Sequence, residues 1–139
     1  MKEYVLDANA LVRLFRNEPG ADRIEQLLIQ ADKGQTTLHI SMVNLAEVLY
    51  VASRYFPIEE VRRNIEKIHE LVEFAVPDER QSLFAGELRH HYKLGLADCF
   101  AAALAIEKSA TLVTADAEFK KLGRKLKVLA LPQHQRCLE

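Results

Sequence analysis

The sequence predicts an α/β/α sandwich in which helices cover both faces of a mostly parallel five-stranded sheet. Short β-type runs alternate with longer helical ones, no repeat or linker interrupts them, and hydrophobic residues make up 49% of the chain. Such alternation is typical of parallel sheets, because each crossover helix returns the chain to the same edge. With 139 residues the chain has the length of one domain, so we expect residues 1–139 to form a single unit.

The first half of the chain contains two predicted strands and three predicted helices. They are Tyr4–Leu6, Ala10–Phe15, Ile24–Ala31, Thr37–Ile40 and Val43–Tyr55. Turn residues at 17–20 separate the first two helices, and Gly34 ends the second. Ser41 is placed to cap the third helix, since a serine side chain accepts hydrogen bonds from backbone N–H groups at a helix start. Pro57 then ends this helix.

The second half continues the alternation. We expect a helix from Pro57 to Leu71, a strand at Phe74–Val76, a helix from Asp78 to Tyr92, a helix at Ala97–Lys108, a strand at Thr111–Thr114, a short helix around Glu118 and a strand at Val128–Ala130. Proline is favoured in the first turn of a helix, which suits Pro57. Pro77 closes the strand before it, and Asp78 can cap the helix that follows.

Composition and charge exclude several classes of protein. Lys and Arg number 19 against 20 Asp and Glu, and this net charge of −1 does not by itself indicate a nucleic-acid binder. The longest apolar run is Cys99–Ile106, whereas a membrane span needs about 20 residues, and we expect no signal peptide. Only 2 cysteines are present, too few for a disulfide framework, which favours a reduced, cytoplasmic setting.

Asp7 and Asp116 follow two strands that should be neighbours. Asp7 comes directly after the first strand, and Asp116 comes two residues after the fourth. In a flavodoxin-like strand order, 3-2-1-4-5, strands one and four flank the point where the order reverses, and ligands bind there beyond the carboxyl ends of the strands. We therefore expect the two carboxylates to meet in that crevice.

Asp98 and Glu47 are acids in apolar surroundings. Asp98 is the only charged residue from Leu94 to Ile106, and a carboxylate there needs a hydrogen bond, a proton or a metal. It lies in the first turn of its helix, where the helix dipole favours negative charge. Glu47 lies in a helix that is apolar on both sides, which predicts a buried helix and a paired glutamate.

Each acid also has a purely structural interpretation. Asp7 and Asp116 could cap helices, and Asp98 could simply complement the helix dipole. Independent caps, however, have no reason to converge at one edge of the sheet. Two unit charges about 4 Å apart repel by about 4 kcal/mol at an effective dielectric of 20, so a cluster binds a cation or takes up protons. Oxygen ligands without histidine favour Mg²⁺ or Mn²⁺ over zinc, and such a site activates water to attack a phosphate.

Four segments together resemble one family. They are Tyr4–Leu11, Ser41–Glu47, Leu96–Cys99 and Leu112–Phe119. Each is weak alone, but they come in the family's order and nearly its spacing across almost the whole chain. The chain resembles a PIN-domain ribonuclease, most closely a VapC-like toxin of a type II toxin–antitoxin pair. The segment at 90–95 is loosely patterned in the family, so no residue there is carried over.

The resemblance implies a PIN-like fold and Mg²⁺- or Mn²⁺-dependent endonucleolytic cleavage of RNA. It assigns Asp7, Glu47, Asp98 and Asp116 to the acidic site. The metal would be held by Asp7 and Asp98, with Asp116 bound directly or through water. Glu47 would orient or deprotonate the attacking water, or hold a second metal.

The same resemblance extends to neighbouring residues and to partners. Asn9 and Thr114 match polar positions that orient a ligand, a water or the scissile phosphate, and Glu118 would be an outer acid. The resemblance also implies a homodimer and a small protein antitoxin whose extended tail covers the groove. The apolar helices between Val43 and Leu71 are candidates for that interface, although they also fit an ordinary core.

Basic residues show no pattern that separates RNA contacts from solvated surface charge. Arginines such as Arg13, Arg16, Arg54 and Arg89 could contact phosphates, but single charges of this kind are more often solvated. The basic stretch at 120–127 could carry RNA or simply keep an edge strand soluble.

Two other families that handle phosphate fit the sequence less well. A phospho-acceptor receiver domain needs an aspartate at the end of strand three, where Pro77 stands, and it would use neither Glu47 nor Asp98. A haloacid-dehalogenase-type phosphatase needs a second acid two residues after its nucleophile, where Asn9 stands. The remaining alternative is a PIN-like module that binds RNA or a partner without cutting, although mutually repelling carboxylates would bring such a module no advantage.

Overall fold

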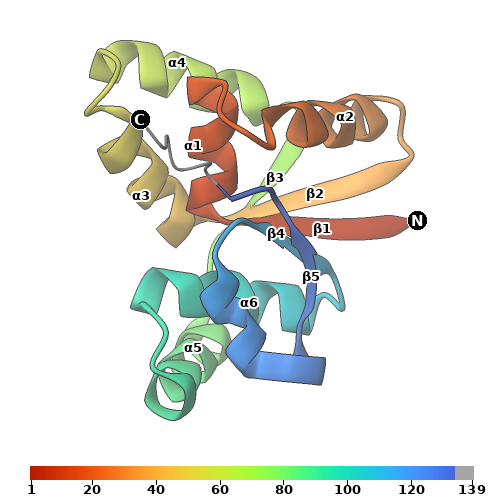
Figure 1. Ribbon diagram of the computed structural model, residues 1–139, viewed down its shortest axis with the longest axis vertical. Coiled ribbons are helices and arrows are strands. Elements are labelled where there is room, and N and C mark those ends of the chain that lie inside the picture. The colour runs from red at the N-terminus through yellow and green to blue at the C-terminus, as the bar shows by residue number, and fades with distance from the viewer. Residues whose placement is uncertain (134–139) are drawn as a thin grey trace, which may run out of the picture.

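The computed structural model describes residues 1–133 and is built around one parallel sheet. The strands are β1 (Lys2–Leu6), β2 (Thr36–Ser41), β3 (Val72–Ala75), β4 (Thr111–Thr114) and β5 (Lys127–Ala130). They lie in the order β3-β2-β1-β4-β5, and every neighbouring pair is parallel. The predicted sandwich and strand order are therefore confirmed (Figure 1).

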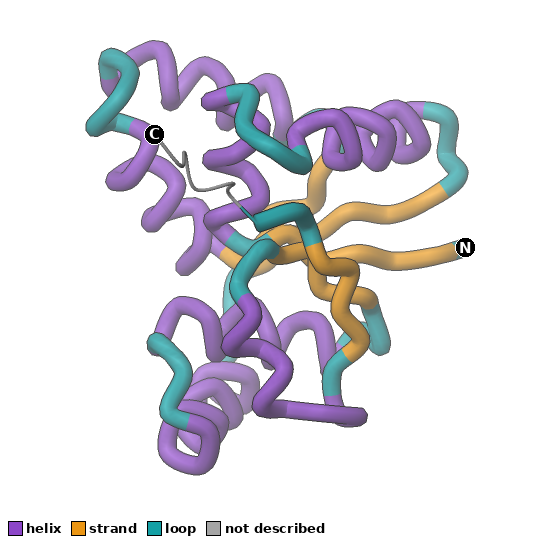
Figure 2. Tube along the Cα trace, in the orientation of Figure 1, coloured by secondary structure: helices purple, strands orange, loops and turns teal. Residues whose placement is uncertain are grey.

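Helices form a layer on each face of the sheet (Figures 1 and 2). One layer holds α1 (Ala8–Arg16), α2 (Ala21–Asp32), α3 (Met42–Ala52) and α4 (Ile58–Ile68). The other holds α5 (Glu79–Tyr92), α6 (Leu96–Glu107) and the 3-10 helix η1 (Ala117–Lys125). Each layer has its own apolar core, and the successive β1 residues Val5 and Leu6 belong to different cores. This alternation follows from the period of two in a β-strand.

Apart from the short helix around Glu118, the element boundaries lie within three residues of the predicted ones, and the differences have local causes. The helix α3 ends at Ala52 rather than Tyr55, because a turn intervenes before Pro57. The strand β3 ends at Ala75, so that Val76, predicted as strand, is 80% exposed. The short helix expected around Glu118 is a longer 3-10 segment.

The prediction that α3 is buried on both sides is wrong. Tyr50 is 64% exposed and Met42 is 43% exposed, whereas Leu45 and Val48 belong to the core. The reason is the position of the helix in its layer. It packs against α1, α4 and α6, and no element within residues 1–133 covers its remaining side.

The predicted helix caps are present. Ser41 Oγ accepts a hydrogen bond from the Val43 backbone N at 3.2 Å, at the start of α3. Asp78 Oδ1 accepts from the Gln81 backbone N at 2.8 Å, at the start of α5. These caps stabilise helices whose first N–H groups would otherwise lack partners.

Two further expectations concern cysteines and membranes. Cys99 is buried and free, as expected for a small core residue, and Cys137 lies outside the described residues. Within residues 1–133, no helix has the length and apolar character that a membrane crossing requires.

Candidate active site

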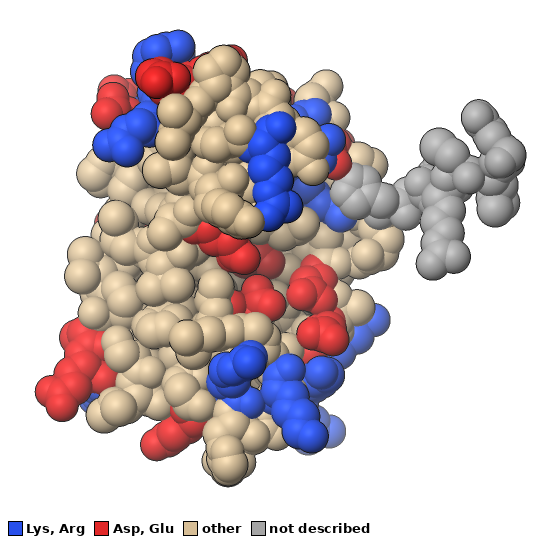
Figure 3. All heavy atoms as spheres, turned by 90° about the vertical axis from the view of Figure 1, so that its left-hand side faces the viewer, with Lys and Arg blue, Asp and Glu red and all other residues tan. Residues whose placement is uncertain are grey.

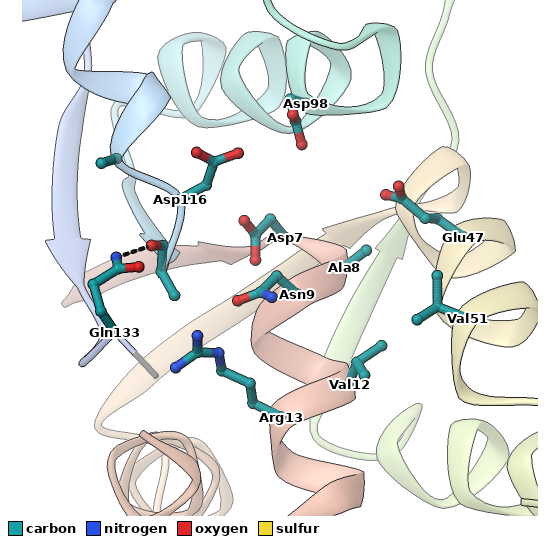
Figure 4. Close-up of a pocket in the computed structure, with 12 residues that line it drawn as sticks. Asp7, Ala8, Asn9, Val12, Arg13, Glu47, Val51, Asp98, Asp116 and Gln133 are labelled. Carbon is teal, nitrogen blue, oxygen red and sulfur yellow. Dashed lines mark hydrogen bonds between the residues drawn. The ribbon is translucent and has the colours of Figure 1, made fainter. Parts of the chain in front are cut away.

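One cavity lies at the edge of the sheet where β1 and β4 end, as the strand order predicts. Its volume is about 580 Å³, and four acids from different parts of the fold line it. They are Asp7 before α1, Glu47 in α3, Asp98 in α6 and Asp116 after β4. Figure 4 shows the four carboxylates directed into a common space, with Glu47 and Asp116 on opposite sides. The predicted convergence of these side chains is thus observed.

Asp7 is held by hydrogen bonds at the start of α1 and is only 2% exposed. Its Oδ1 accepts from the Ala10 backbone N at 2.8 Å, and its Oδ2 accepts from the Thr114 hydroxyl. Burial raises the pKa of Asp7 to about 7. The charges of Asp98 and Asp116 add to this rise, and the two hydrogen bonds oppose it.

Thr114 connects Asp7 with Asp116. Its hydroxyl donates to Asp7 and accepts from the Asp116 backbone N at 3.0 Å. Asp116 in turn caps η1, because its Oδ1 accepts from the Glu118 backbone N at 2.9 Å. The structural interpretation of these two acids is therefore compatible with the cluster, since both acids cap helices and both reach the cavity.

Asp98 enters the cavity from the first turn of α6 and is half-buried. Burial, with the charges of Asp116, Glu47 and Glu118, raises the pKa of Asp98 to about 6. Gly95 stands directly before this helix, and a Cβ there would lie 3.3 Å from Asp98 Oδ2. The glycine therefore leaves room for the carboxylate.

The other predicted site residues differ in their position relative to the cavity: some line it, and others act on it from outside. Glu47 is half-buried rather than buried, and burial raises its pKa. Asn9 is exposed and lines the cavity, whereas Thr114 acts through its hydrogen bond to Asp7. Glu118 has a side chain 57% exposed and forms a 3.7 Å ion pair with Lys121. It lies outside the cavity lining and affects the site through its charge on Asp98.

The sequence of the chain matches a known family of domains. The family model of the PIN domain matches residues 4–125. This chain belongs to the PIN domain family. The matched range contains all four segments that carry the resemblance, which is confirmed at that level. Among curated proteins, no match to the sequence is found.

Several solved structures similar to this PIN domain are VapBC structures. One is VapBC2 from Rickettsia felis bound to a promoter DNA fragment. A chain of that structure is 26% identical to this chain, with a TM-score of 0.75, and the match covers 92% of this chain and 98% of that one. VapBC-1 from nontypeable Haemophilus influenzae gives 28% identity and a TM-score of 0.71, covering 92% and 97%. DNA-bound VapBC from Salmonella typhimurium, at 20% identity, TM-score 0.75 and coverage of 94% and 98%, shows the fold alone. The likeness to VapC-like toxins is thereby confirmed.

The acids of this PIN domain suit a hard divalent cation whose coordination is completed by other ligands. Within residues 1–133, no three His, Cys, Asp or Glu side chains stand close enough to hold a metal ion by themselves. Mg²⁺, however, is usually bound by one or two carboxylates together with waters and substrate phosphates. Burial, with the charges of neighbouring acids, raises the pKa of Asp7 and of Asp98, and a bound cation would offset both effects. The donor set therefore suits Mg²⁺ or Mn²⁺.

Two side chains of the PIN-domain site were not apparent from the sequence. Asn44 is fully buried, and its Nδ2 donates to the Ala97 backbone O at 3.0 Å, so that it ties α3 to α6 beside Asp98. Its spacing of three residues from Glu47 is the only sequence signal for this role. Gln133 lines the cavity and donates to the backbone after β4, from a segment that shows no pattern.

Proposed function

We propose that this PIN-domain protein is a Mg²⁺- or Mn²⁺-dependent endoribonuclease that hydrolyses RNA phosphodiester bonds. One observation carries the proposal: Asp7, Asp98 and Asp116 converge on one open cavity, where burial, together with the charges of the latter two, raises the pKa of Asp7. Such a cluster favours a bound cation over three free charges. Basic side chains lie above and below this acidic hollow (Figure 3), and they would attract a polyanion.

The four acids have different parts in this proposal. Asp7 and Asp98 hold the cation, and Asp116 holds it directly or through a water. A bound divalent cation lowers the pKa of a water and offsets the negative charge that develops on the phosphate. Glu47 faces the same space from α3 with a raised pKa. Its carboxylate orients or deprotonates the attacking water, or holds a second metal.

The neighbouring polar residues position these groups. Thr114 fixes the Asp7 carboxylate through its hydroxyl, which also accepts from the backbone of Asp116. Asn9 is exposed at the cavity and has an amide that can donate to a phosphate oxygen. Glu118 adds negative charge behind Asp98 without entering the cavity.

The test is cleavage of total cellular RNA by the purified protein, with Mg²⁺ or Mn²⁺ and with EDTA. Discrete fragments that require the metal and disappear with Asp7→Asn are expected. A folded, partner-free protein that cuts no RNA with either metal would instead favour the alternative, a PIN-like module that binds RNA or a partner without cutting it.

An apolar groove between α3 and α4 supports a small protein antitoxin as a partner. It has a volume of about 260 Å³, and its apolar lining consists of Met42, Leu45, Ala46, Leu49, Ile65 and Phe74. Tyr50, Tyr55 and Ile58 of the same layer are also exposed, and exposed apolar patches mark interaction sites. Co-expression with the neighbouring reading frame should yield a complex in which cleavage is inhibited.

We further propose that the chain acts in the cytoplasm as one domain and as a homodimer. Light scattering on the purified chain tests the dimer. A mass near the 15.8 kDa of a single chain at micromolar concentration would contradict it.

A further inference from the structure

The cavity has a basic corner, formed by Arg13. On α1, Arg13 follows Asn9 by four residues, so the two side chains lie on the same face of the helix. Both line the cavity with the acids. Figure 4 shows Arg13 on the far side of Asp7 and Asn9 from Asp98. The lining of the cavity therefore includes a positively charged guanidinium group as well as a cluster of acids.

Arg13 is buried, and no acidic partner for it lies within the described residues 1–133. Arg13 is 3% exposed, and none of the ion pairs within residues 1–133 includes it. Its Nη1 donates to the Pro19 backbone O at 2.9 Å and to the Pro132 backbone O, whereas its Nε is buried with no partner. A buried guanidinium with an unused N–H indicates a missing anion, because burial of an unpaired charge is costly.

The guanidinium is held in place by the chain around it. Gly20, at φ +97°, packs the turn after α1 against the segment after β5, where an added Cβ would lie 3.2 Å from Leu131 Cβ. The Pro19 and Pro132 carbonyl groups that Arg13 bonds belong to these two segments. Little side-chain entropy is therefore lost when this arginine binds a ligand.

We propose that Arg13 binds a backbone phosphate of the RNA next to the phosphate at the acids, an inference that rests on the proposed function. A small free anion would be repelled by the nearby carboxylates. A phosphodiester chain differs, because one of its phosphates can share the cation with the acids while the next meets Arg13. An arginine fork suits phosphate oxygens, to which it donates two N–H groups in parallel.

The test measures binding of a short fluorescent single-stranded RNA, taken from a cleaved site, to full-length protein in the non-cleaving Asp7→Asn background. Arg13→Gln should lower the affinity by about tenfold to a hundredfold. It should also reduce the slope of log affinity against log salt by about 0.7, the value of one phosphate contact on a single strand. Arg13→Lys should keep the slope.

Arg16→Gln is the matched control on the same helix. Arg16 is exposed, pairs with Glu18 at 3.4 Å and lies over the Tyr55 ring, so its loss should change neither the affinity nor the slope. Each phosphate of the RNA can also be replaced in turn by a neutral methylphosphonate. At one position beside the scissile bond, this replacement should lower the affinity of the Asp7→Asn protein. It should leave the affinity unchanged when the same protein also carries Arg13→Gln.

Two results would overturn the inference in distinguishable ways. If the wild type cuts RNA while Arg13→Gln leaves the salt slope unchanged, Arg13 only holds the cavity wall and the nuclease proposal stands. If the wild type neither binds nor cuts RNA, the proposed function fails and this inference fails with it. Thermal unfolding of each variant confirms that it is folded.

Discussion

Asp7 and Asp116 differ from Asp98 and Glu47 in how the fold holds them. The first two accept hydrogen bonds from helix starts and share the Thr114 hydroxyl. Within residues 1–133 the second two accept none, and the packing of α3 against α6 sets their positions. Asp7 and Asp116 therefore cap helices as well as shaping the cavity, whereas Asp98 and Glu47 shape the cavity without capping a helix.

This difference shows that a structural role and a chemical role can coincide in one carboxylate. A capping aspartate is fixed by the backbone, so its oxygens are already oriented when a ligand arrives. An acid on a packed helix has only its neighbours to orient it. Substitutions on the two sides of the cavity should therefore have different consequences for stability.

The largest expected effect is on cleavage, and it should be equal for the two sides. Asp7→Asn and Asp98→Asn should each slow RNA cleavage by about 10³-fold, since each removes a proposed ligand of the cation. Asp7→Ala should be about 1 kcal/mol less stable than Asp98→Ala, because only the first loses a helix cap. Both variants lose a carboxyl group with a raised pKa, so that contribution is similar in the two at pH 5. Single-turnover rates and urea unfolding in EDTA at pH 5 measure both effects. Full activity in either Asn variant would contradict the proposed ligand set.

The second prediction concerns the pH dependence of stability without metal. The pKa of Asp7 is raised from 3.8 to about 7 in the folded protein, so between these values the folded state holds a proton that the unfolded state has released. The stabilisation should fall as the pH rises through this window, by about 1.4 kcal/mol per pH unit and up to about 4 kcal/mol in total. Asp7→Asn keeps the capping oxygen and cannot ionise, so it should be more stable than wild type at pH 8.

Urea unfolding in EDTA from pH 4 to pH 8 checks this, with the difference between variant and wild type as the readout. Carboxylates that do not interact with Asp7 cancel in that difference. Saturating Mg²⁺ should remove most of it by stabilising the wild type. A difference that is constant with pH would mean that Asp7 ionises as an ordinary aspartate.

A third prediction tests whether the packing of α3 against α6 positions its acids. Asn44→Leu removes the hydrogen bond to Ala97 and should lower stability by about 1–3 kcal/mol and cleavage by about tenfold. Gln81→Leu is the matched control, because Gln81 is also buried and bonds Glu107 at 2.8 Å, between α5 and α6. It should lower stability and leave cleavage unchanged. Equal cleavage by the two variants would show that Asn44 has no positioning role.

The smallest expected effect comes from the room beside Asp98. Gly95→Ala would place a Cβ 3.3 Å from Asp98 Oδ2, and a displaced carboxylate should lower cleavage by a few-fold. Gly86→Ala in α5 is the control, since a Cβ there meets nothing within 4 Å. It should raise stability by about 0.5–1 kcal/mol through helix propensity and leave cleavage unaltered. Cleavage rates of the two variants at one fixed metal concentration test this prediction. Equal rates would show that the space beside Asp98 does not affect cleavage.

The features that could be predicted from the sequence depend on local periodicity and strand order. β1 and β4 are short apolar runs, and their adjacency places Asp7 and Asp116 together whatever the side chains around them. The exposure of Tyr50 could not be predicted, because it depends on which elements pack against α3. The burial of Arg13 depends likewise on a carbonyl group 119 residues away in the chain, and no pattern in the sequence reports such a contact.

The most direct test of the central claim, that the carboxylate cluster is the metal-dependent catalytic site, is the single-turnover cleavage rate of one RNA as a function of Mn²⁺ concentration. The wild type and Asp98→Asn are compared. The rate of the wild type should rise with Mn²⁺ and saturate, and that of Asp98→Asn should be lower and need more metal. Cleavage that persists in EDTA, or a variant indistinguishable from the wild type, would contradict the account.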